Sequence, residues 1–551
     1  MGRNRLDGFL WADMIAAGAR NLHVHMEEVN DLNVFPIPDG DTGENMMLTM
    51  QGGVKATKNA EASLCDTATR ISDGMLLGAR GNSGVILSQF FAGISQGFQT
   101  YREADMHTLE KAIACGVGCA FESVMTPTEG TILTVMRDAG SYAGNLNCET
   151  VEDYFAAFIE EAQRSLEHTP ELLPILREAG VVDSGGAGLL YIVRGMYACL
   201  IGQEIDGEDA VLATHLQAVD PDLFDEDCVM EFGYCTELLL RLQNCKVDTA
   251  HFDAEVITEF LKGVGDSVAL VKNGTIVKLH VHTMIPYKVL EFCQRYGEFL
   301  TVKIENMMLQ HNGTVKKEES EMQASTPVSE RRPFSVVSVA SGEGIERAFL
   351  EMGADEVIRG GQTMNPSAED FLRAFERVNA DVVFVLPNNG NILLAARQAA
   401  QLYKKSDVRV IPTRSIGDGY AVLSMLDLDS GDPDVIEEEM KMAIEGVLTA
   451  EISRSIRDAE MNGIEIKKDD YIGIAGKEIL AAGQNREEVA CRTADALDLS
   501  SHSLLLLIRG AGVDHADSAP IVSYLQNKYP LAEICEADGG QDIYDYILVA
   551  E

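Results

Sequence analysis

Two stretches without large apolar runs divide this chain of 551 residues into three parts, and its apolar content is sufficient to build several cores. Residues 202–228 are acidic and poor in aromatic side chains, which is typical of a connector. Residues 312–333 are polar and charged and contain almost no large apolar residue, which predicts an interdomain linker. At ~100–200 residues per domain, the chain has room for roughly three or four domains.

Residues 1–202 are predicted to form an all-helical domain. Apolar residues recur there at helical spacing in long segments such as 6–29 and 108–125, and short Gly-rich turns separate these segments. Few segments show the period-two alternation of a half-buried strand.

Residues 229–311 have the pattern of a small α+β domain. The runs 267–272 and 275–283 alternate, are rich in β-branched residues, and are joined by Asn273-Gly274. Asn-Gly between two such runs predicts a hairpin, because both residues tolerate the positive φ of a type I′ turn. A helical pattern follows at residues 288–296.

Residues 334–551 alternate short apolar runs with helical segments, which indicates parallel-sheet α/β units. The expected strands lie at residues 334–339, 356–358, 382–386 and 409–411. A last segment, 473–551, repeats the rhythm with runs at 504–508 and 543–549. The predicted fold class is therefore a multidomain protein with an all-α, an α+β and an α/β part.

The charge balance excludes several classes of partner. Lys and Arg minus Asp and Glu gives 44 − 87 = −43, and so acidic a chain repels phosphate backbones and anionic membranes. No apolar run reaches the ~20 residues of a membrane span, and the N-terminus lacks the apolar core of a signal peptide. Its 11 cysteines are scattered, unlike a secreted disulfide framework, so a cytoplasmic location is expected.

Residues 33–46, with the sequence NVFPIPDGDTGENM, form the motif richest in chemistry. Asp39 and Asp41 flank a glycine on a segment that two prolines hold extended, directly before a predicted helix. Mg²⁺ typically takes one or two such carboxylates together with substrate phosphates. A plain Asp-Gly turn with solvated carboxylates is the alternative interpretation.

Three further glycine-rich segments precede predicted helices in the same domain. They are GARGNSG at residues 78–84, EGT at 129–131 and DSGGAG at 183–188. Backbone N–H groups at such helix starts are able to bind phosphate, although glycine at a helix boundary often serves only packing. Four such boundaries in one domain suggest that one end of a helix bundle is lined with glycine and acid.

These motifs together resemble the nucleotide-binding domain of the dihydroxyacetone kinase family, and in particular the large subunit of bacterial fatty acid kinase. The resemblance covers nearly the whole chain. Its markers are NVFPIPDGDTGENM, GARGNSGVILSQ, EGTILTV, VDSGGAGL, GYCTE, KLHVHT, GGQTMNPS and LPNNGNI. It implies an N-terminal helical barrel that binds ATP at one end through two Mg²⁺ ions.

The resemblance also implies site residues at matching positions. Asp39 and Asp41 match the metal-binding, catalytic aspartates, and Asn33 stands nearest the place of a third ligand that is Asp in dihydroxyacetone kinases. Arg80 is a candidate cation for the transferring phosphoryl group, with a surface arginine as the alternative. The positions that match nucleotide-contact segments are Thr42, Gly43, Asn45, Gly81, Asn82, Ser83, Gly84, Thr131, Asp183 and Gly185. Thr42 stands where those kinases often carry His, so the roles of that His do not transfer.

Cysteine and histidine residues of the middle part form a candidate Zn²⁺ site. His280 and His282 lie two apart on a predicted strand and so face the same side, while Cys235 lies on another strand. His311 or water would complete the set. Spacing alone favours ordinary sheet histidines beside a buried thiol, whereas the resemblance implies a structural Zn²⁺ at matching Cys and His positions.

The C-terminal part contributes the loops GGQTMNPS (360–367) and LPNNGNI (386–392) after predicted strands. Loops after parallel strands commonly form ligand or partner sites, although Asn and Gly are also plain turn formers. By resemblance this part is a DegV-like domain that docks a DegV-type carrier protein, which presents the fatty acid. A homodimer is also expected from the resemblance.

The favoured interpretation is an ATP-dependent kinase that converts a carrier-bound fatty acid to an acyl phosphate for phospholipid synthesis. One alternative is a kinase of a small polyol of the dihydroxyacetone type. The other is a regulatory or scaffold protein whose nucleotide site only senses ATP. The domain boundaries expected are 1–202 for the helical barrel, 229–311 for the middle domain, 312–333 for the linker and 334–551 for the C-terminal domain.

Overall fold

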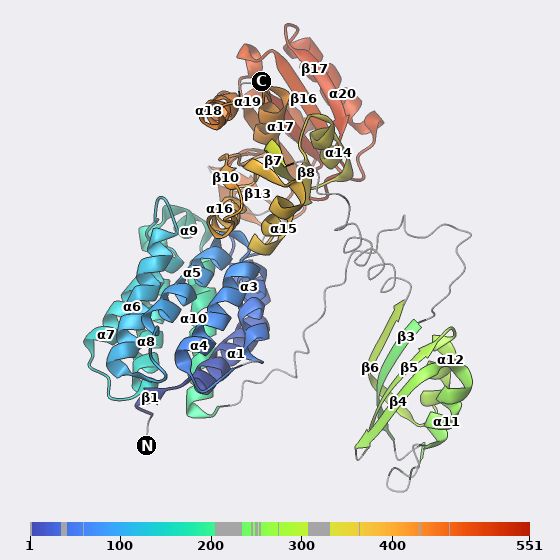
Figure 1. Cartoon of the computed structure of the whole chain (residues 1–551). Helices are drawn as coiled ribbons and strands as arrows, with labels where there is room; N and C mark the ends of the chain where they lie inside the picture. Colours follow the sequence, from blue (N-terminus) through green and yellow to red (C-terminus); the bar gives the residue numbers. More distant parts are fainter. Residues whose placement is uncertain are drawn as a thin grey trace. The chain divides into compact units, whose positions relative to one another are not determined.

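Apolar residues at helical spacing give the N-terminal part a closed ring of helices (Figure 1). The computed structural model describes residues 3–34, 41–58, 60–203, 234–306 without 244, 245, 248, 250, 251, 253, 254 and 274, and 331–551 without 363, 429, 430 and 462. The chain forms two compact units, residues 1–210 with 331–551, and residues 211–330.

The helices of the ring are α1 (Gly8–Val24), α2 (Met26–Asp31), α3 (Thr42–Thr57), α4 (Leu64–Gly78), α5 (Gly81–Gly97), α6 (Met106–Glu122), α7 (Ile132–Asn145), α8 (Val151–Leu172), α9 (Pro174–Ala179) and α10 (Ser184–Ile201). Helix α3 packs on α1, α4 and α5, and α5 packs on α6. Helix α7 packs between α6 and α8, and α10 closes the ring by packing on α8 and α1. The predicted helical barrel is confirmed. Two-residue strands, β1 (Arg5–Leu6) and β2 (Ala104–Asp105), add one short antiparallel pair.

Large aromatic side chains fill the middle of the ring. Trp11 and Phe98 meet edge to face with their centroids 5.5 Å apart, and Phe90, Phe91 and Phe158 are buried nearby in the same core. Helix α10 is, among the described residues, the one helix long and apolar enough to cross a membrane. Because 61% of it is buried and it packs on α1 and α8, we interpret it as a core helix of the ring.

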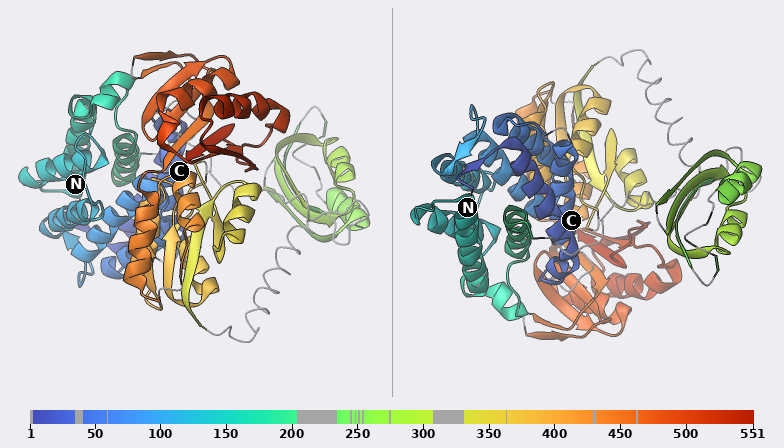
Figure 2. Two further views of the ribbon diagram at one scale, coloured as in Figure 1. Left: turned by 90° about the horizontal axis from the view of Figure 1, so that it is seen from above. Right: turned by 90° about the horizontal axis from the view of Figure 1, so that it is seen from below.

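Residues 234–306 form a four-stranded antiparallel sheet in the order β4-β5-β3-β6, with α11 (Glu255–Val264) and α12 (Pro286–Cys293) on one face (Figure 2). Its strands are β3 (Tyr234–Leu242), β4 (Asp266–Asn273), β5 (Ile276–Thr283) and β6 (Gly297–Asn306). Asn273 pairs with Ile276 across the connection between β4 and β5, so the hairpin predicted from Asn-Gly is confirmed.

The C-terminal part begins with a parallel four-stranded sheet in the order β10-β9-β7-β8. Its strands are β7 (Arg332–Ala340), β8 (Glu356–Arg359), β9 (Ala380–Leu386) and β10 (Asp407–Val410). The helices that alternate with and follow them are α14 (Glu343–Glu351), α15 (Ala368–Val378), α16 (Leu393–Leu402), α17 (Ile416–Ser424) and α18 (Pro433–Ile444). All four predicted strands and the predicted parallel direction are confirmed.

The second half of this part has a mixed sheet, and the prediction of further parallel units is wrong there. The order is β15-β14-β11-β18-β16-β17, and only β16 and β17 run parallel. Because β14 and β15 are joined by a two-residue turn, they can only be antiparallel. Its elements are β11 (Leu448–Arg454), β14 (Tyr471–Ala475), β15 (Glu478–Gly483), α19 (Arg486–Ala496), η3 (Leu499–Ser501), β16 (Leu504–Arg509), α20 (His515–Lys528), β17 (Glu533–Asp538) and β18 (Tyr546–Ala550), with a separate hairpin of β12 (Ala459–Met461) and β13 (Ile464–Ile466).

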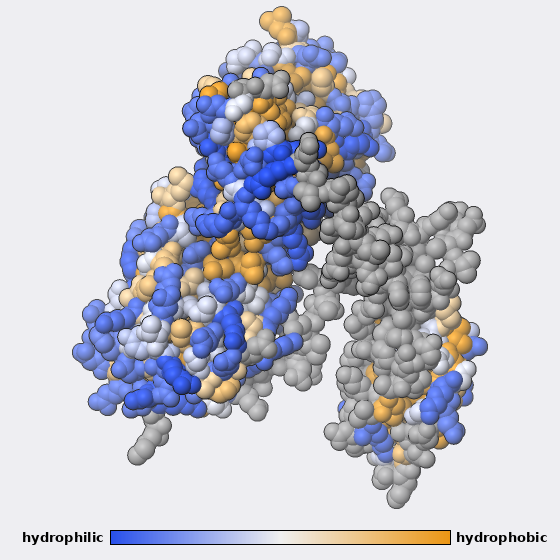
Figure 3. Space-filling model, viewed as in Figure 1, coloured by the Kyte–Doolittle hydropathy of each residue, from blue (hydrophilic) through white to orange (hydrophobic). Residues whose placement is uncertain are grey.

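The parallel-sheet domain packs directly on the helical ring within the same compact unit. Helix α15 contacts α4, α16 contacts α5, and Ala79 and Val85 of the ring are buried in the apolar core beneath the parallel sheet. Hydrophilic side chains cover much of the face in Figure 3, with apolar residues in small groups between them. The connector and linker predicted at 202–228 and 312–333 fall almost entirely outside the described residues.

Candidate functional site

The starts of α3, α5, α7 and α10 meet at one end of the ring, and polar contacts link them pairwise. Thr42, the first residue of α3, donates from its hydroxyl to Asn33 Oδ1 at 2.8 Å. Ser184, the first residue of α10, lies 3.4 Å from the same Asn33 oxygen and 3.3 Å from the Thr42 hydroxyl. The helix starts singled out from the sequence are therefore brought together.

Glycine allows α5 to approach α3 closely at this end. Gly81 has a positive φ of 57°, and a Cβ there would lie 2.5 Å from Asn45 Nδ2. A Cβ on Gly84 would lie 2.4 Å from the hydroxyl of Thr49, which itself donates to the Asn45 carbonyl at 2.7 Å. Both glycines thus serve helix packing, and the packing brings the start of α5 beside Asn45.

Asp183 joins the start of α10 to that of α7. Its carboxylate accepts from the N–H of Gly186 at 2.7 Å and also from the N–H of Ile132. Removal from water raises the pKa of Asp183 to about 6, and the two backbone donors oppose that rise. Asp183 therefore acts as a helix cap whose charge carries a cost.

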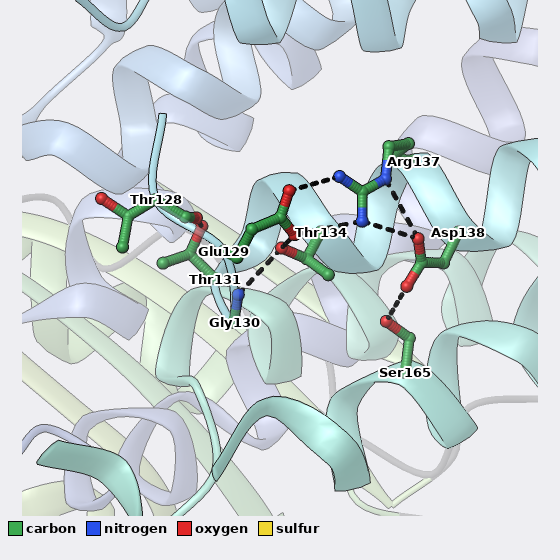
Figure 4. A network of polar contacts seen from close by, with 8 residues as sticks. All are labelled: Thr128, Glu129, Gly130, Thr131, Thr134, Arg137, Asp138 and Ser165. Atoms are coloured by element: carbon green, nitrogen blue, oxygen red, sulfur yellow. Dashed lines mark hydrogen bonds and ion pairs between the residues drawn. The ribbon is translucent and has the colours of Figure 1, made fainter. Parts of the chain in front are cut away.

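A polar network fixes the EGT segment before α7 (Figure 4). Arg137 donates to Glu129 at 2.5 Å and to Asp138 at 3.1 Å, and Thr134 donates to Glu129 at 2.9 Å. The Thr131 hydroxyl bonds to the Thr128 carbonyl at 2.8 Å. The arginine lowers the pKa of Glu129, so the carboxylate stays ionised and holds the loop in place.

The residues that directly precede α3, α5 and α7 make no side-chain cap hydrogen bond of their own. Two side chains from elsewhere each accept from one of these first-turn N–H groups: Asn30 Oδ1 from Gly43 in α3 at 2.7 Å, and Asp183 from Ile132 in α7. The first N–H groups of a helix and its dipole attract anions, above all phosphate. Asp41 directly precedes α3 and supplies carboxylate oxygens at the same place. The arrangement combines donors for phosphate with hard oxygen ligands for a divalent cation.

The C-terminal part supplies a residue to this end of the ring that the sequence did not single out as a site residue. Asn365, in the loop between β8 and α15, donates from its side-chain amide to Asp41 and lies 3.5 Å from Asn45 Oδ1. Its main-chain carbonyl accepts from Arg80 at 2.8 Å. The side chain of Arg80 is 21% exposed and also lies 3.8 Å from Asp370.

The C-terminal part also contacts the ring at the end of α2 and just after it. Arg457 donates to the carbonyl of Asp31 at 2.9 Å and to that of Asn33. Val34 packs against the apolar cluster of β12–β15. The GGQTMNPS segment was identified in the sequence, but as a partner loop; only the tertiary structure reveals that it contacts the helical ring.

A cavity of about 750 Å³ lies where the loops after β7, β8, β9 and β10 converge in the C-terminal part. Gly360–Gln362 and Pro387–Leu393 line it, as expected for loops at the carboxyl ends of parallel strands. Asn82 of the ring also lines this cavity, and its amide bonds to Asn391 at 3.2 Å.

Several predicted ligands lie outside the described residues. Asp39 and His311 are among them, and so are the side chains of Cys235, His280 and His282. The backbone register nevertheless pairs Cys235 on β3 with His282 on β5. Among the described residues no group of three or more His, Cys, Asp or Glu is arranged to hold a metal ion.

Comparison with known proteins shows matches along most of the chain. Residues 36–198 match the DAK2 domain, residues 231–314 match the FakA-like middle domain of fatty acid kinase, and residues 335–551 match the FakA-like C-terminal domain of fatty acid kinase. "Protein YloV" of Bacillus subtilis (strain 168) is 39% identical over 562 residues, which covers 100% of each chain.

Solved structures match at low similarity. The dihydroxyacetone kinase from C. freundii, in complex with AMP-PNP and Mg²⁺, covers 56% of this chain and 57% of its own at 13% identity and a TM-score of 0.32. The Streptococcus pneumoniae fatty acid kinase B3 protein, loaded with linoleic acid, covers 40% of this chain and 99% of its own at 11% identity and a TM-score of 0.29.

Proposed function

The chain belongs to the FakA-like family of fatty acid kinase proteins, and on that premise we propose that it transfers the γ-phosphoryl group of ATP to the carboxylate of a fatty acid. The product is an acyl phosphate for phospholipid synthesis. The domain boundaries 1–202, 229–311 and 334–551 belong to the same proposal.

One observation carries the proposal: Asp41, the side chains of Thr42 and Asn45, and the starts of α3 and α5 meet at one end of the ring, and neither helix is capped by the side chain of the residue that precedes it. Phosphate binds at such helix starts, and carboxylate and amide oxygens suit Mg²⁺. Asn365 Oδ1, next to this site, is buried without a hydrogen-bond partner among the described residues, as suits a neighbour of a hydrated cation. The residues therefore fit a Mg²⁺-nucleotide complex.

The roles of the residues follow from the charges involved. A fatty acid carboxylate is already ionised at neutral pH, so the reaction needs no general base. The P–O bond to the β-phosphate breaks, a P–O bond to the carboxylate forms, and ADP leaves. Repulsion between two anions is the obstacle, and positioned donors and cations relieve it. Asp41 with Asp39 and Asn33 would hold Mg²⁺, which neutralises phosphate charge.

Arg80 is suited to compensate negative charge on the transferring group. Its side chain is half-buried, and one of its amino groups donates to the carbonyl of Asn365. A cation held in this way needs little reorganisation when charge develops nearby. Thr42, Gly43, Asn45, Gly81–Gly84, Thr131, Asp183 and Gly185 are proposed to surround the nucleotide.

The acyl chain belongs to a second protein in this proposal. A DegV-type carrier presents the fatty acid and docks on the C-terminal α/β domain, next to the ring. Support comes from the family and from the cavity at the carboxyl ends of the parallel strands, which Asn82 of the ring also lines. A homodimer in the cytoplasm stays a prediction of the family resemblance.

The middle domain is proposed to hold a structural Zn²⁺ through Cys235, His280, His282 and His311. The antiparallel register supports this, because directly paired residues have Cβ atoms ~4.5–5.5 Å apart and Cys235 is paired with His282. His280 lies two residues away on the same strand, hence on the same face.

The test is transfer of labelled γ-phosphate from ATP to fatty acid, with Mg²⁺, the full chain and a fatty-acid-loaded DegV-type carrier from the same genome. We expect a labelled acyl phosphate with the wild type and loss of at least about 100-fold with Asp41→Ala. Asp13→Ala, which changes an exposed acid of α1, is the matched control and should react as the wild type does.

Transfer to dihydroxyacetone but not to fatty acid would instead establish the small-polyol kinase. Tight nucleotide binding without transfer to either acceptor would favour an ATP sensor or scaffold. Undiminished transfer by Asp41→Ala would refute the assignment of the metal site.

A further inference from the structure

We propose that the C-terminal domain forms part of the phosphoryl-transfer site, and that Asn365 is a positioning residue that holds the Asp41 carboxylate for the metal ion. The inference rests on the proposed function, since it assigns Asp41 to metal binding. The C-terminal domain would then position a metal ligand at the proposed nucleotide site in addition to docking a carrier.

The loop that carries Asn365 is fixed at both ends. At its start, the N–H of Gly360 donates to the Ala340 carbonyl at 2.9 Å, and the N–H of Gly361 donates to the Met364 carbonyl at 3.1 Å. At its end, Ser367 and Asp370 form a capping box that begins α15. Asn365 therefore lies between two anchored points of the chain, which favours a residue that orients another side chain.

The loop is also anchored to the ring beside the site. The N–H of Ala368 donates to the carbonyl of Ala79 at 3.3 Å, and Ala79 directly precedes Arg80. Through this contact and the bond from Arg80 to its carbonyl, Asn365 is held in register with the start of α5. Its side chain then reaches Asp41 at the start of α3.

The chemistry of the contact suits a metal ligand. A carboxylate has about four lone-pair positions, so Asp41 can accept from the Asn365 amide and still bind a cation. Hydrogen bonds of this kind fix the rotamer of a ligating carboxylate, and loss of such a partner typically costs ~10–100-fold in metal affinity or activity. The donor here comes from a residue about 320 positions away in the sequence.

Burial sets Asn365 apart from a simple docking contact. The residue is 2% exposed, yet its Oδ1 has no hydrogen-bond partner among the described residues. Leaving a buried acceptor unpaired costs ~1–3 kcal/mol, so an amide is poorly suited to a purely structural contact between the two domains at this position. A role toward Asp41 and the ligand beside it accounts for the choice of Asn.

Gln398 of α16 provides a matched contact without that role. It is 4% exposed and also bridges the two domains: its amide donates to the Leu76 carbonyl at 2.6 Å, and its Oε1 accepts from Gln89 at 3.0 Å and from Ser88 at 3.3 Å. These three hydrogen bonds lead to α4 and α5 and to neither Asp41 nor Asn45. Replacing Gln398 perturbs docking alone.

The experiment measures Mn²⁺ binding to the full chain by electron paramagnetic resonance, with AMP-PNP present and no acyl acceptor. Asn365→Ala and Asn365→Leu, whose side chain has the same heavy-atom branching as Asn, both keep the main-chain contact to Arg80 and remove the amide. We expect both variants to bind Mn²⁺ ~10–100-fold more weakly than the wild type, and Gln398→Ala to stay within ~3-fold of it. Trp11 fluorescence confirms that each variant is folded, since the chain has a single Trp, buried in α1.

In the labelled-phosphate assay, raised Mg²⁺ should restore turnover by the Asn365 variants, which a loss of docking would not allow. Wild-type affinity in both Asn365 variants would overturn the inference and leave the proposed function intact. Equal weakening by Gln398→Ala would also overturn it, because domain docking alone would then explain the loss. Absence of Mn²⁺ and AMP-PNP binding to the wild type would overturn the proposed function and this inference together.

Discussion

Replacing Asp183 by Asn should remove a pH-dependent cost to the stability of the helical ring. The carboxylate accepts from the N–H groups of Gly186 and Ile132, but its surroundings raise its pKa from 3.8 to about 6. The folded state therefore binds a proton more tightly than the unfolded chain does. Stability that the protonated form provides is present at low pH and is lost as the pH rises from about 4 to about 6.

The magnitude follows from the two pKa values. The difference between about 6 and 3.8, at ~1.36 kcal/mol per pKa unit, makes the charged carboxylate cost up to about 3 kcal/mol at neutral pH. Roughly half of this, about 1 to 2 kcal/mol, falls between pH 5 and pH 7.5. Asn is neutral throughout and keeps an oxygen for one of the two N–H groups.

The assay is urea unfolding followed by the fluorescence of Trp11, the one Trp of the chain, which reports on the ring alone. Relative to the wild type, Asp183→Asn should gain about 1 to 2 kcal/mol between pH 5 and pH 7.5. Asp105→Asn is the control: Thr108 lowers the pKa of this helix cap, so its relative stability should not change over that range. An Asp183→Asn difference that is the same at both pH values would refute the reasoning.

Two further substitutions test the packing at the proposed nucleotide site and the proposed Zn²⁺ site of the middle domain. Gly84→Ala places a Cβ 2.4 Å from Thr49 Oγ1, so it should lower the free energy of unfolding by ~1–3 kcal/mol and weaken AMP-PNP binding measured by calorimetry. The control Gly118→Ala, whose Cβ would have nothing within 4 Å, should be neutral or stabilising. Unchanged AMP-PNP binding by Gly84→Ala would contradict the role of this close approach. Elemental analysis of the purified chain should find close to one zinc per chain, and Cys235→Ser should lose it. Cys293→Ser should keep the zinc, since Cys293 is a buried thiol whose pKa is raised to about 12. A wild type without zinc would refute the site.

Local signals in the sequence were sufficient where neighbours along the chain decide the structure. The Asn273-Gly274 hairpin and the four strands of the parallel sheet belong to this group, because turn chemistry and short apolar runs specify them. The second C-terminal sheet was mispredicted as parallel. An apolar run such as 504–508 is buried in either direction, and only its partner strands decide whether it pairs parallel or antiparallel.

The candidate site divides in the same way. Asp41, Thr42 and Asn45 could be named from one continuous motif, and the structure places them at a helix start beside α5 and α10. Asn365 could not, because no local pattern states which surface a loop about 320 residues away will face. The sequence offered only that its segment follows a strand and is rich in glycine and polar residues.

The two kinds of contact between the C-terminal domain and the ring explain how such a site can be built across domains. Apolar burial of Ala79 and Val85 beneath the parallel sheet is non-directional, so it stabilises docking without fixing any atom at the site. The bonds from Asn365 to Asp41 and from Arg80 to the Asn365 carbonyl are directional, and Arg80 directly follows Ala79. Docking energy supplied by the apolar contact thus holds polar groups in place at the helix starts. A change in the C-terminal domain that shifts this loop should therefore alter the surroundings of Asp41 even when it contacts no residue of the proposed nucleotide site.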